Sequence, residues 1–413
     1  MTLRILGSFV TTVAVAVLSF SAGAVTVMID YVEVEDAPAG FHDSPNQAAR
    51  REAFERALEI WTSQLAGDVT LDARVFYQDD EFFLGGKDIH ASAKPTSASA
   101  NLGPLPFSAT FYPAALASQL TGNSHPATTG DAVGSHMQVI FNDEFHMGSP
   151  GTPIWWYEFE NPTGPGNISF LTIALHELGH AFGMFPLVQT STTSINPGAW
   201  VNLLIEPIPT EPTTLPFGDI YSRFLTRTPV GGGVNDEDFF DMNNAERFAA
   251  ATSGEVYFTG ANVKAAAEFT PPPAAPLTSF KGEIQILASS PFTQGSLLGH
   301  WDNDHIVDLV LKPETPPGFE LHDIDATREL MQDLGWTLLS PPVSGAVAWV
   351  DFGFPGEEYG TEVLPFNTFG EAVDFVTSGG TINIKPGTSG ESLTVNKAMT
   401  VNAVGGTATI GQP

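Results

Sequence analysis

The chain has 413 residues, of which 42% are hydrophobic and 11% aromatic, a composition typical of folded proteins with more than one core. Its formal net charge of -31 sets 47 acidic residues against only 16 lysine and arginine residues, so we expect no nucleic-acid partner. There is no cysteine, which excludes disulfides, thiolate nucleophiles and thiolate metal ligands.

Residues 1–24 have the pattern of a signal peptide. Arg4 precedes an apolar run from Ile5 to Phe20, and the small residues Ala22-Gly23-Ala24 follow. A membrane anchor is the alternative, but the run is short and ends in an A-x-A-like cleavage site. We therefore predict cleavage after Ala24 and a secreted, extracellular protein. No later stretch is long and apolar enough to span a bilayer, so we expect no stable membrane insertion after signal removal.

The first half of the mature chain alternates strands with a helix. A β-branched run predicts a strand within Val25–Glu35, and two further strands are expected at Val69–Tyr77 and Met137–Asn142. Between the first two, Asp43-Ser44-Pro45 should begin a helix over NQAARREAFERALEIWTSQLAG. The apolar side chains on one face of this helix are Phe54, Ala57, Leu58, Trp61 and Leu65.

Weaker patterns surround a second helix. The stretch 85–129 is read as loop with one short helix at Pro113–Leu120. NISFLTIALHELGHAFGM, residues 167–184, predicts a helix with Asn167 or Ser169 as its cap and Gly183 near its end. Residues 185–298 are irregular, and 270–276 could be a linker or an exposed loop within one domain.

The predicted helix contains His176-Glu177-Leu178-Gly179-His180, an H-E-x-x-H sequence. Its i, i+4 spacing places both imidazoles on one helix face, where they can bind one Zn²⁺ ion. The neighbouring Glu177 would be the general base for a zinc-bound water that attacks a peptide carbonyl. The alternative, in which both histidines only pack or cap, must explain three polar side chains in an apolar segment.

A catalytic zinc site needs a third protein ligand and an open fourth position. In the compact pattern H-E-x-x-H-x-x-G-x-x-H the third histidine would fall at Pro186, which cannot bind a metal. His300, in Gly299-His300-Trp301-Asp302, is our favoured third ligand, 120 residues after His180. The alternatives are His305, Asp302, Asp304, His322 and Asp219.

At this point the sequence resembles the leishmanolysin-like branch of the metzincin peptidases and related secreted bacterial zinc proteases. In these, a long insertion precedes a third histidine in an S-H-W context, and an L-M-x-P turn follows. The resemblance covers residues 25–340 in patches, namely ATFYPAALASQLTG, VIFNDEF, DIYSRFL, DMNNAERFAA and RELMQDLGW. It implies a zincin fold and His300 as a ligand. Gly299 and Leu311 depart from the family's serine and turn methionine.

The groups that support the zinc ligands are not specified by the sequence. An aspartate or a backbone carbonyl should orient each ligating imidazole, and Asp302, Asp333 and Glu246 are candidates by neighbourhood. The DND segment at 302–304 could alternatively be a solvated turn or a Ca²⁺ site.

Residues 350–413 resemble the opening coil of pectin-lyase-like right-handed β-helices. A helix over Phe366–Thr377 precedes the short strand candidates TINIK, LTVN, MTVNA and TATIG, a spacing that suggests β-solenoid coils. The segment has room for scarcely more than one coil, so we read it as accessory.

Together these features predict an α+β protein with three parts: a signal peptide (1–24), a metzincin-like zinc peptidase domain with a mixed sheet (25–340, with a 187–299 insertion), and a β-solenoid-like segment (350–413). The expected function is zinc-dependent endopeptidase acting on a protein or peptide substrate. The alternative is an extracellular binding or adhesion protein with a structural or degenerate zinc site. A polysaccharide-cleaving enzyme has little support because the solenoid-like segment is so short.

Overall fold

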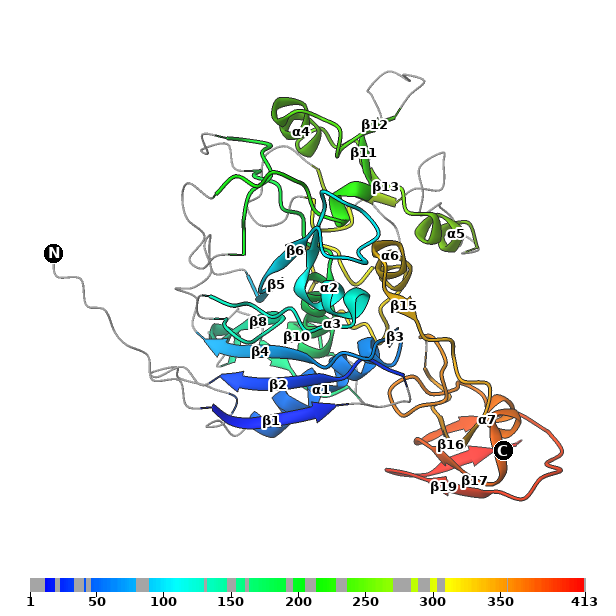
Figure 1. The fold of residues 1–413 in the computed structure, drawn as a ribbon. Helices are drawn as coiled ribbons and strands as arrows, with labels where there is room; N and C mark the ends of the chain where they lie inside the picture. Colours follow the sequence, from blue (N-terminus) through cyan, green and yellow to red (C-terminus); the bar gives the residue numbers. More distant parts are fainter. Residues whose placement is uncertain are drawn as a thin grey trace. The chain divides into compact units, whose positions relative to one another are not determined.

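A computed structural model gives the fold of the chain (Figure 1). It divides the chain into two compact units, with residues 1–320 and 324–338 in unit 1 and residues 321–323 and 339–413 in unit 2. The residues that the structure describes are 12–18, 23–32, 41, 46–78, 89–129, 132–146, 154–159, 163–190, 196–204, 213–227, 236–269, 284–288, 298–302, 309–354 and 356–411.

Unit 1 contains a five-stranded mixed sheet in the order β1-β2-β4-β8-β5. Strands β2 (Val27–Val32), β4 (Leu71–Gln78) and β8 (Met137–Asn142) are parallel. At the two edges, β1 (Thr12–Leu18) and β5 (Ala91–Pro95) run antiparallel to their neighbours. All six residues of β8 are buried, which is why its sequence is apolar with almost no alternation. The mixed α+β class predicted from the sequence is confirmed at this level.

Strand β1 lies inside the predicted signal peptide. The peptide bond after Ala24 is buried in the folded chain, because Ala24 is 4% exposed and Val25 is fully buried. Cleavage there would have to precede folding, and β2 would then become the edge of the sheet. Removal of residues 1–24 stays a prediction. Among the residues that the structure describes, no helix combines the length and the hydropathy needed to cross a membrane.

Helices α1 (Gln47–Thr62) and α3 (Phe170–Phe182) pack against each other, and α3 also contacts β5 and β8. The predicted apolar face of α1 is confirmed for Phe54, Ala57, Leu58 and Trp61, which are fully buried. The helix ends at Thr62, before the predicted end, so the fifth residue of that face, Leu65, is fully buried in strand β3 instead. The Trp61 indole nitrogen donates to the Leu175 carbonyl at 2.9 Å, which ties α1 to the middle of α3. The predicted cap at 43–45 lies outside the described residues.

The loop expected at 85–129 is only partly a loop. The short helix is confirmed as α2 (Ala114–Thr121), but β5, β6 (Ala98–Ala100) and β7 (Phe111–Pro113) also form there. The β5 sequence, ASAKP, has weak strand propensity and pairs through its backbone with the buried β8. Tertiary pairing therefore overrides composition at this sheet edge.

The second half of unit 1 is more regular than its sequence suggests. A four-stranded sheet has the order β12-β11-β13-β14, with strands Glu237–Asp238, Leu225–Arg227, Val256–Phe258 and Ile284–Ile286. The associated helices are α4 (Asn244–Ala251), α5 (Ala261–Phe269) and α6 (Thr327–Leu334). Residues 270–276 lie outside the described residues. The remaining short strands of unit 1 are β3 (Leu65–Ala66), β9 (Ile154–Trp156), β10 (Asn167–Ser169) and β15 (Thr337–Leu338).

Unit 2 is built from parallel strand pairs. Strands β16 (Gly345–Val350), β17 (Val376–Ile384) and β19 (Thr400–Ala403) form one sheet, and β18 (Gly387–Ser389) pairs with β20 (Ala408–Ile410). Helix α7 (Phe369–Phe375) confirms the predicted helix and packs on β16 and β17. Three of the four strand candidates form, as parts of β17, β19 and β20, whereas LTVN at 393–396 is not a strand.

Candidate metal centre

Helix α3 carries both histidines of the H-E-x-x-H sequence. The Ser169 hydroxyl accepts a hydrogen bond from the Thr172 amide at 3.2 Å and caps the helix, as one of the two predicted caps. Every residue of α3 is buried, so this short helix is held by packing and not by its own propensity. At its end Gly183 has φ 156°, and the chain turns so that the Met184 carbonyl faces back toward the helix.

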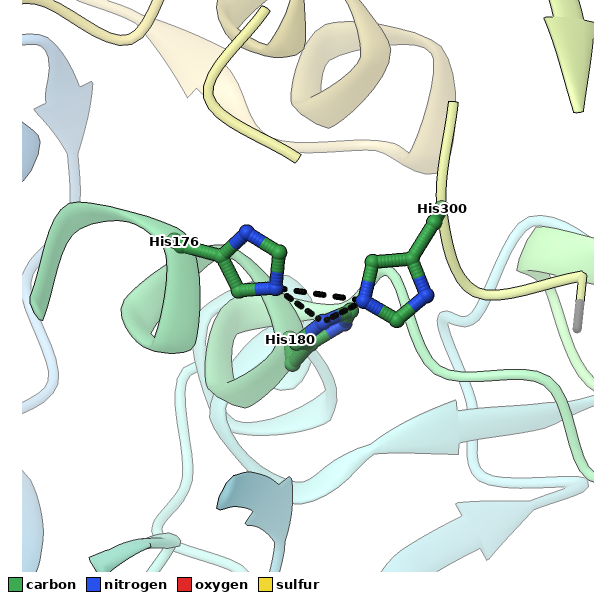
Figure 2. A group of neighbouring side chains, drawn as sticks. All are labelled: His176, His180 and His300. Carbon is green, nitrogen blue, oxygen red and sulfur yellow. Dashed lines mark hydrogen bonds between the residues drawn. The ribbon is translucent and has the colours of Figure 1, made fainter. Parts of the chain in front are cut away.

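His300 joins His176 and His180 (Figure 2). The three Nε2 atoms form a nearly equilateral triangle, with separations of 3.1 Å (His176 to His180), 3.1 Å (His176 to His300) and 3.2 Å (His180 to His300). The side chains are 7%, 8% and 7% exposed in sequence order. In the described part of the chain, this is the one group of three or more metal-ligating side chains with donor atoms within 4.8 Å of one another.

The opposite ring nitrogens show which way the lone pairs point. His176 Nδ1 lies 2.8 Å from the Val310 carbonyl oxygen, and His180 Nδ1 lies 2.9 Å from the Met184 carbonyl oxygen. A carbonyl can only accept, so both Nδ1 atoms carry the proton and both Nε2 atoms present lone pairs to the centre of the triangle. At most one of the three Nε2 atoms can donate, and the others repel one another unless a cation lies between them.

This triangle has the dimensions of a metal site. A tetrahedral zinc ion lies roughly 2.0–2.1 Å from each imidazole nitrogen, which requires those nitrogens to be ~3.3 Å apart. The observed separations of 3.1–3.2 Å are close to this value. A neutral three-imidazole donor set also suits other first-row divalent ions, so the geometry supports a metal site without fixing the metal.

Burial keeps the imidazoles of His176 and His180 neutral. It lowers the pKa of His180 to about 4, against a backbone hydrogen bond to Met184 that acts in the opposite direction. For His176, burial and the neighbouring rings His180 and His300 hold the pKa well below 6.5. Neutral imidazole is the form that binds metal ions, so the surroundings favour binding over a wide pH range.

A tight turn, Leu309–Lys312, lies beneath the triangle and is closed by a hydrogen bond from the Lys312 amide to the Leu309 carbonyl at 3.1 Å. The Leu311 side chain packs directly against the backbone of Gly179, where an added Cβ would come within 2.8 Å of Leu311 Cδ1. Leu311 therefore forms an apolar floor against α3, and Gly179, the residue just before His180, provides the space for it.

Backbone contacts fix the position of His300. Its carbonyl accepts from the Leu287 amide at 2.9 Å, and the next residue, Trp301, donates its amide to the Leu311 carbonyl at 2.9 Å. On the other side, the buried Tyr221 hydroxyl donates to the Leu298 carbonyl at 2.7 Å. The segment that carries the third histidine is thus held between β14 and the turn.

Glu177 lies next to His176 on α3 and is 6% exposed. Its Oε2 atom is buried with no hydrogen-bond partner among the described residues, and burial raises the pKa of the carboxyl to about 8. A buried carboxyl without a partner is costly. A cation and a water molecule nearby would satisfy it, as the sequence motif requires.

The other predicted ligands do not join the triangle where they are described. Asp219 is buried, but its carboxylate accepts hydrogen bonds from the Leu187 amide, the Ser222 amide and the Ser222 hydroxyl. His322 belongs to unit 2, where its ring contacts Phe354. Asp302 is 8% exposed and is not part of the group of three. Asp304 and His305 lie outside the described residues.

Two of the supporting groups suggested from the sequence have other roles. Asp333 accepts from the Asn262 and Val263 amides at the start of α5, and Glu246 completes a capping box with Asn243 on α4. The groups that do orient the imidazoles, the carbonyls of Val310 and Met184, are backbone atoms that no sequence signal marks. A Ca²⁺ site at 302–304 stays a prediction, because only Asp302 of that segment is described.

Comparison with known proteins gives no relative: no protein-family model matches the chain, and neither does any curated protein or solved structure.

Proposed function

We propose that the chain is a zinc-dependent endopeptidase in which His176, His180 and His300 bind the metal and Glu177 is the general base. The observation that carries this proposal is the triangle of Nε2 atoms that His300 forms with the two histidines of the H-E-x-x-H helix. The Nδ1 atoms of His176 and His180 are already hydrogen-bonded to backbone carbonyls. When bound, the metal would supply a Lewis acid and lower the pKa of a coordinated water. The metzincin-like peptidase fold belongs to this proposal.

The protein side of the reaction rests on Glu177. Its unpartnered Oε2 atom is the acceptor for the proton of the attacking water. The same carboxyl then gives that proton to the amine of the leaving peptide. Because α3 is buried along its whole length, the carboxyl has little freedom to turn away from this position.

An extended peptide is the substrate shape that the sheet edge favours. Strand β5 ends the sheet order, runs antiparallel to β8 and contacts α3. A peptide paired with the outer edge of β5 would therefore lie along the strand nearest to the helix that carries the histidines. Unit 2, which we propose as an accessory solenoid-like segment, contributes none of the three histidines or Glu177.

The direct test compares the zinc-loaded mature chain with its Glu177→Gln variant on casein or a quenched fluorescent peptide library. Loss of the general base should lower the cleavage rate by about 10²- to 10⁴-fold. Zinc content should stay the same, because Glu177 is not a ligand. As a control, Glu246→Gln on α4 should keep full activity, since glutamine also completes a capping box.

Equal activity in wild type and Glu177→Gln would rule out the proposed mechanism. A wild type that binds zinc tightly through four protein ligands and cleaves nothing would favour the alternative, a binding protein with a structural zinc site.

A further inference from the structure

Asp325 lies between the two chain segments that complete the metal site. It precedes Ala326, the N-cap residue of α6, in unit 1 and has φ 42°, a left-handed conformation that aspartate, asparagine and glycine tolerate best. Its Oδ2 atom accepts a hydrogen bond from the Val310 amide. Its Oδ1 atom accepts from both the amide and the hydroxyl of Thr327, each at 3.0 Å.

The first path leads from Asp325 to His176. The Val310 amide donates a hydrogen bond to Asp325, and the Val310 carbonyl oxygen accepts a hydrogen bond from His176 Nδ1, 2.8 Å away. These bonds lie on either side of one α-carbon, so the carboxylate fixes the orientation of the carbonyl that orients the ring. Hydrogen bonds to a charged acceptor are about twice as strong as neutral ones.

The second path leads to His300. The Thr327 hydroxyl donates a hydrogen bond to Asp325 and accepts one from the Trp301 indole nitrogen at 3.3 Å. Trp301 follows His300 in sequence, is fully buried, and donates its amide to the Leu311 carbonyl in the turn. One carboxylate therefore reaches two of the three histidines, on segments that the chain brings together only in the folded state.

We propose that Asp325 is the positioning residue of the metal site: it sets the direction of the His176 imidazole through Val310 and the backbone of His300 through Thr327 and Trp301. The inference rests on the metal-binding part of the proposed function and does not depend on proteolysis. Its role needs a carboxylate, because only two oxygens without protons can serve all three donors.

Two substitutions remove the Asp325 carboxylate while keeping the backbone conformation at this position. Asp325→Asn keeps the preference for positive φ but replaces one acceptor oxygen with an amide donor, and Asp325→Gly removes the side chain without straining φ. Thr327→Val removes only the hydroxyl on the path to Trp301. A matched control is Asp333→Asn, because Asp333 also accepts three hydrogen bonds, two from Asn262 and one from Val263, at the start of α5.

The experiment measures zinc affinity by competition with a chromogenic chelator and records the visible spectrum of the Co²⁺-loaded chain, with unfolding of each metal-free variant as a stability readout. Asp325→Asn and Asp325→Gly should weaken zinc binding by about 10- to 100-fold and change the Co²⁺ ligand-field bands. Thr327→Val should shift both in the same direction by less. Asp333→Asn should bind zinc within about threefold of wild type, however much stability it loses.

Unchanged zinc affinity and an unchanged Co²⁺ spectrum in Asp325→Asn would overturn the proposal, as would equal weakening in Asp333→Asn. If Asp325→Asn does not fold, Asp325→Gly and Thr327→Val decide the question by the same criteria. A wild type that binds zinc and cleaves no peptide would refute the peptidase function and leave this inference intact. A wild type that binds neither zinc nor Co²⁺ would refute both.

Discussion

The two compact units bury different kinds of side chain. The core of unit 2 is an apolar cluster around Val350, Phe369, Val376 and Ile382, and Lys385 is the one charged residue among its described buried side chains. Unit 1 buries His176, His180 and His300 with their nitrogen atoms within 4.8 Å of one another, and it also buries Glu177, the neighbour of His176 in sequence. Burying a polar side chain costs free energy, so a cluster of such side chains indicates a functional site. The candidate metal centre therefore lies in unit 1, and we propose only a packing role for the strands of unit 2.

The largest expected effect on this difference between the units comes from His300→Ala. Loss of one of three ligands should weaken zinc binding by more than about 100-fold, beyond the usual cost of losing a supporting group. In hydrogen exchange, zinc should protect α3 and the turn Leu309–Lys312 in wild type but not in the variant, and β16 and β17 should not respond in either.

His136→Ala is the control for His300→Ala. His136 is another buried histidine of unit 1, but it is not part of the triangle. Its Nδ1 atom accepts a hydrogen bond from the Asp72 amide at 3.0 Å, and its Nε2 atom contacts the Ser124 hydroxyl. It should keep wild-type zinc affinity. Zinc loss in both variants would mean that any damage to unit 1 releases the metal, and the ligand assignment would lose its support.

A smaller effect is expected from acid. Burial and, to a smaller extent, the neighbouring His125 lower the pKa of His136 from 6.5 to about 4, so its imidazole is neutral in the native state. The unfolded chain takes up a proton first, and stability present above pH 6.5 is lost as the pH falls toward 4, by at most about 3 kcal/mol.

Urea unfolding of the metal-free chain at neutral and acid pH measures this loss. In His136→Asn, whose side-chain oxygen can replace Nδ1 as acceptor for the Asp72 amide, that part of the pH dependence should disappear. The acid loss should appear in unit 1 probes and not in those of unit 2. Identical pH profiles of wild type and variant would contradict the assignment.

The smallest effect concerns the floor of the site. In Gly179→Ala the new Cβ would come 2.8 Å from Leu311 Cδ1, and such overpacking should destabilise unit 1 by about 1–3 kcal/mol. Adding Leu311→Ala should recover part of the loss. Gly390→Ala in unit 2 is the control, since its Cβ meets nothing within 4 Å. A neutral Gly179→Ala would show that Leu311 is not packed as described.

The parts of the site that follow from local spacing could be predicted from the sequence, and the parts that follow from tertiary contacts could not. His176 and His180 are one helical turn apart, so their shared face is a property of α3 itself. His300 was suggested by the family resemblance and lies with them in the structure. The oxygens of Val310 and Met184 are backbone atoms, and Asp325 acts through a residue that only folding brings near, so neither leaves a sequence pattern.

The fold shows the same division. Strand β8 has a strong pattern and forms where expected, and helix α1 forms but ends at Thr62, before its predicted end. Strand β5 has a weak pattern and forms because β8 offers it a backbone partner. This missed strand is the edge strand that contacts α3, and it is therefore the strand on which the proposed substrate binding depends.

X-ray absorption spectroscopy of the zinc-loaded mature chain at the zinc edge tests the central claim most directly. We predict one ion with three imidazole nitrogens at roughly 2.0–2.1 Å and one further oxygen from solvent, with one imidazole lost in His300→Ala. A site closed by four protein ligands, or a chain that binds no zinc, would contradict a catalytic metal centre at His176, His180 and His300.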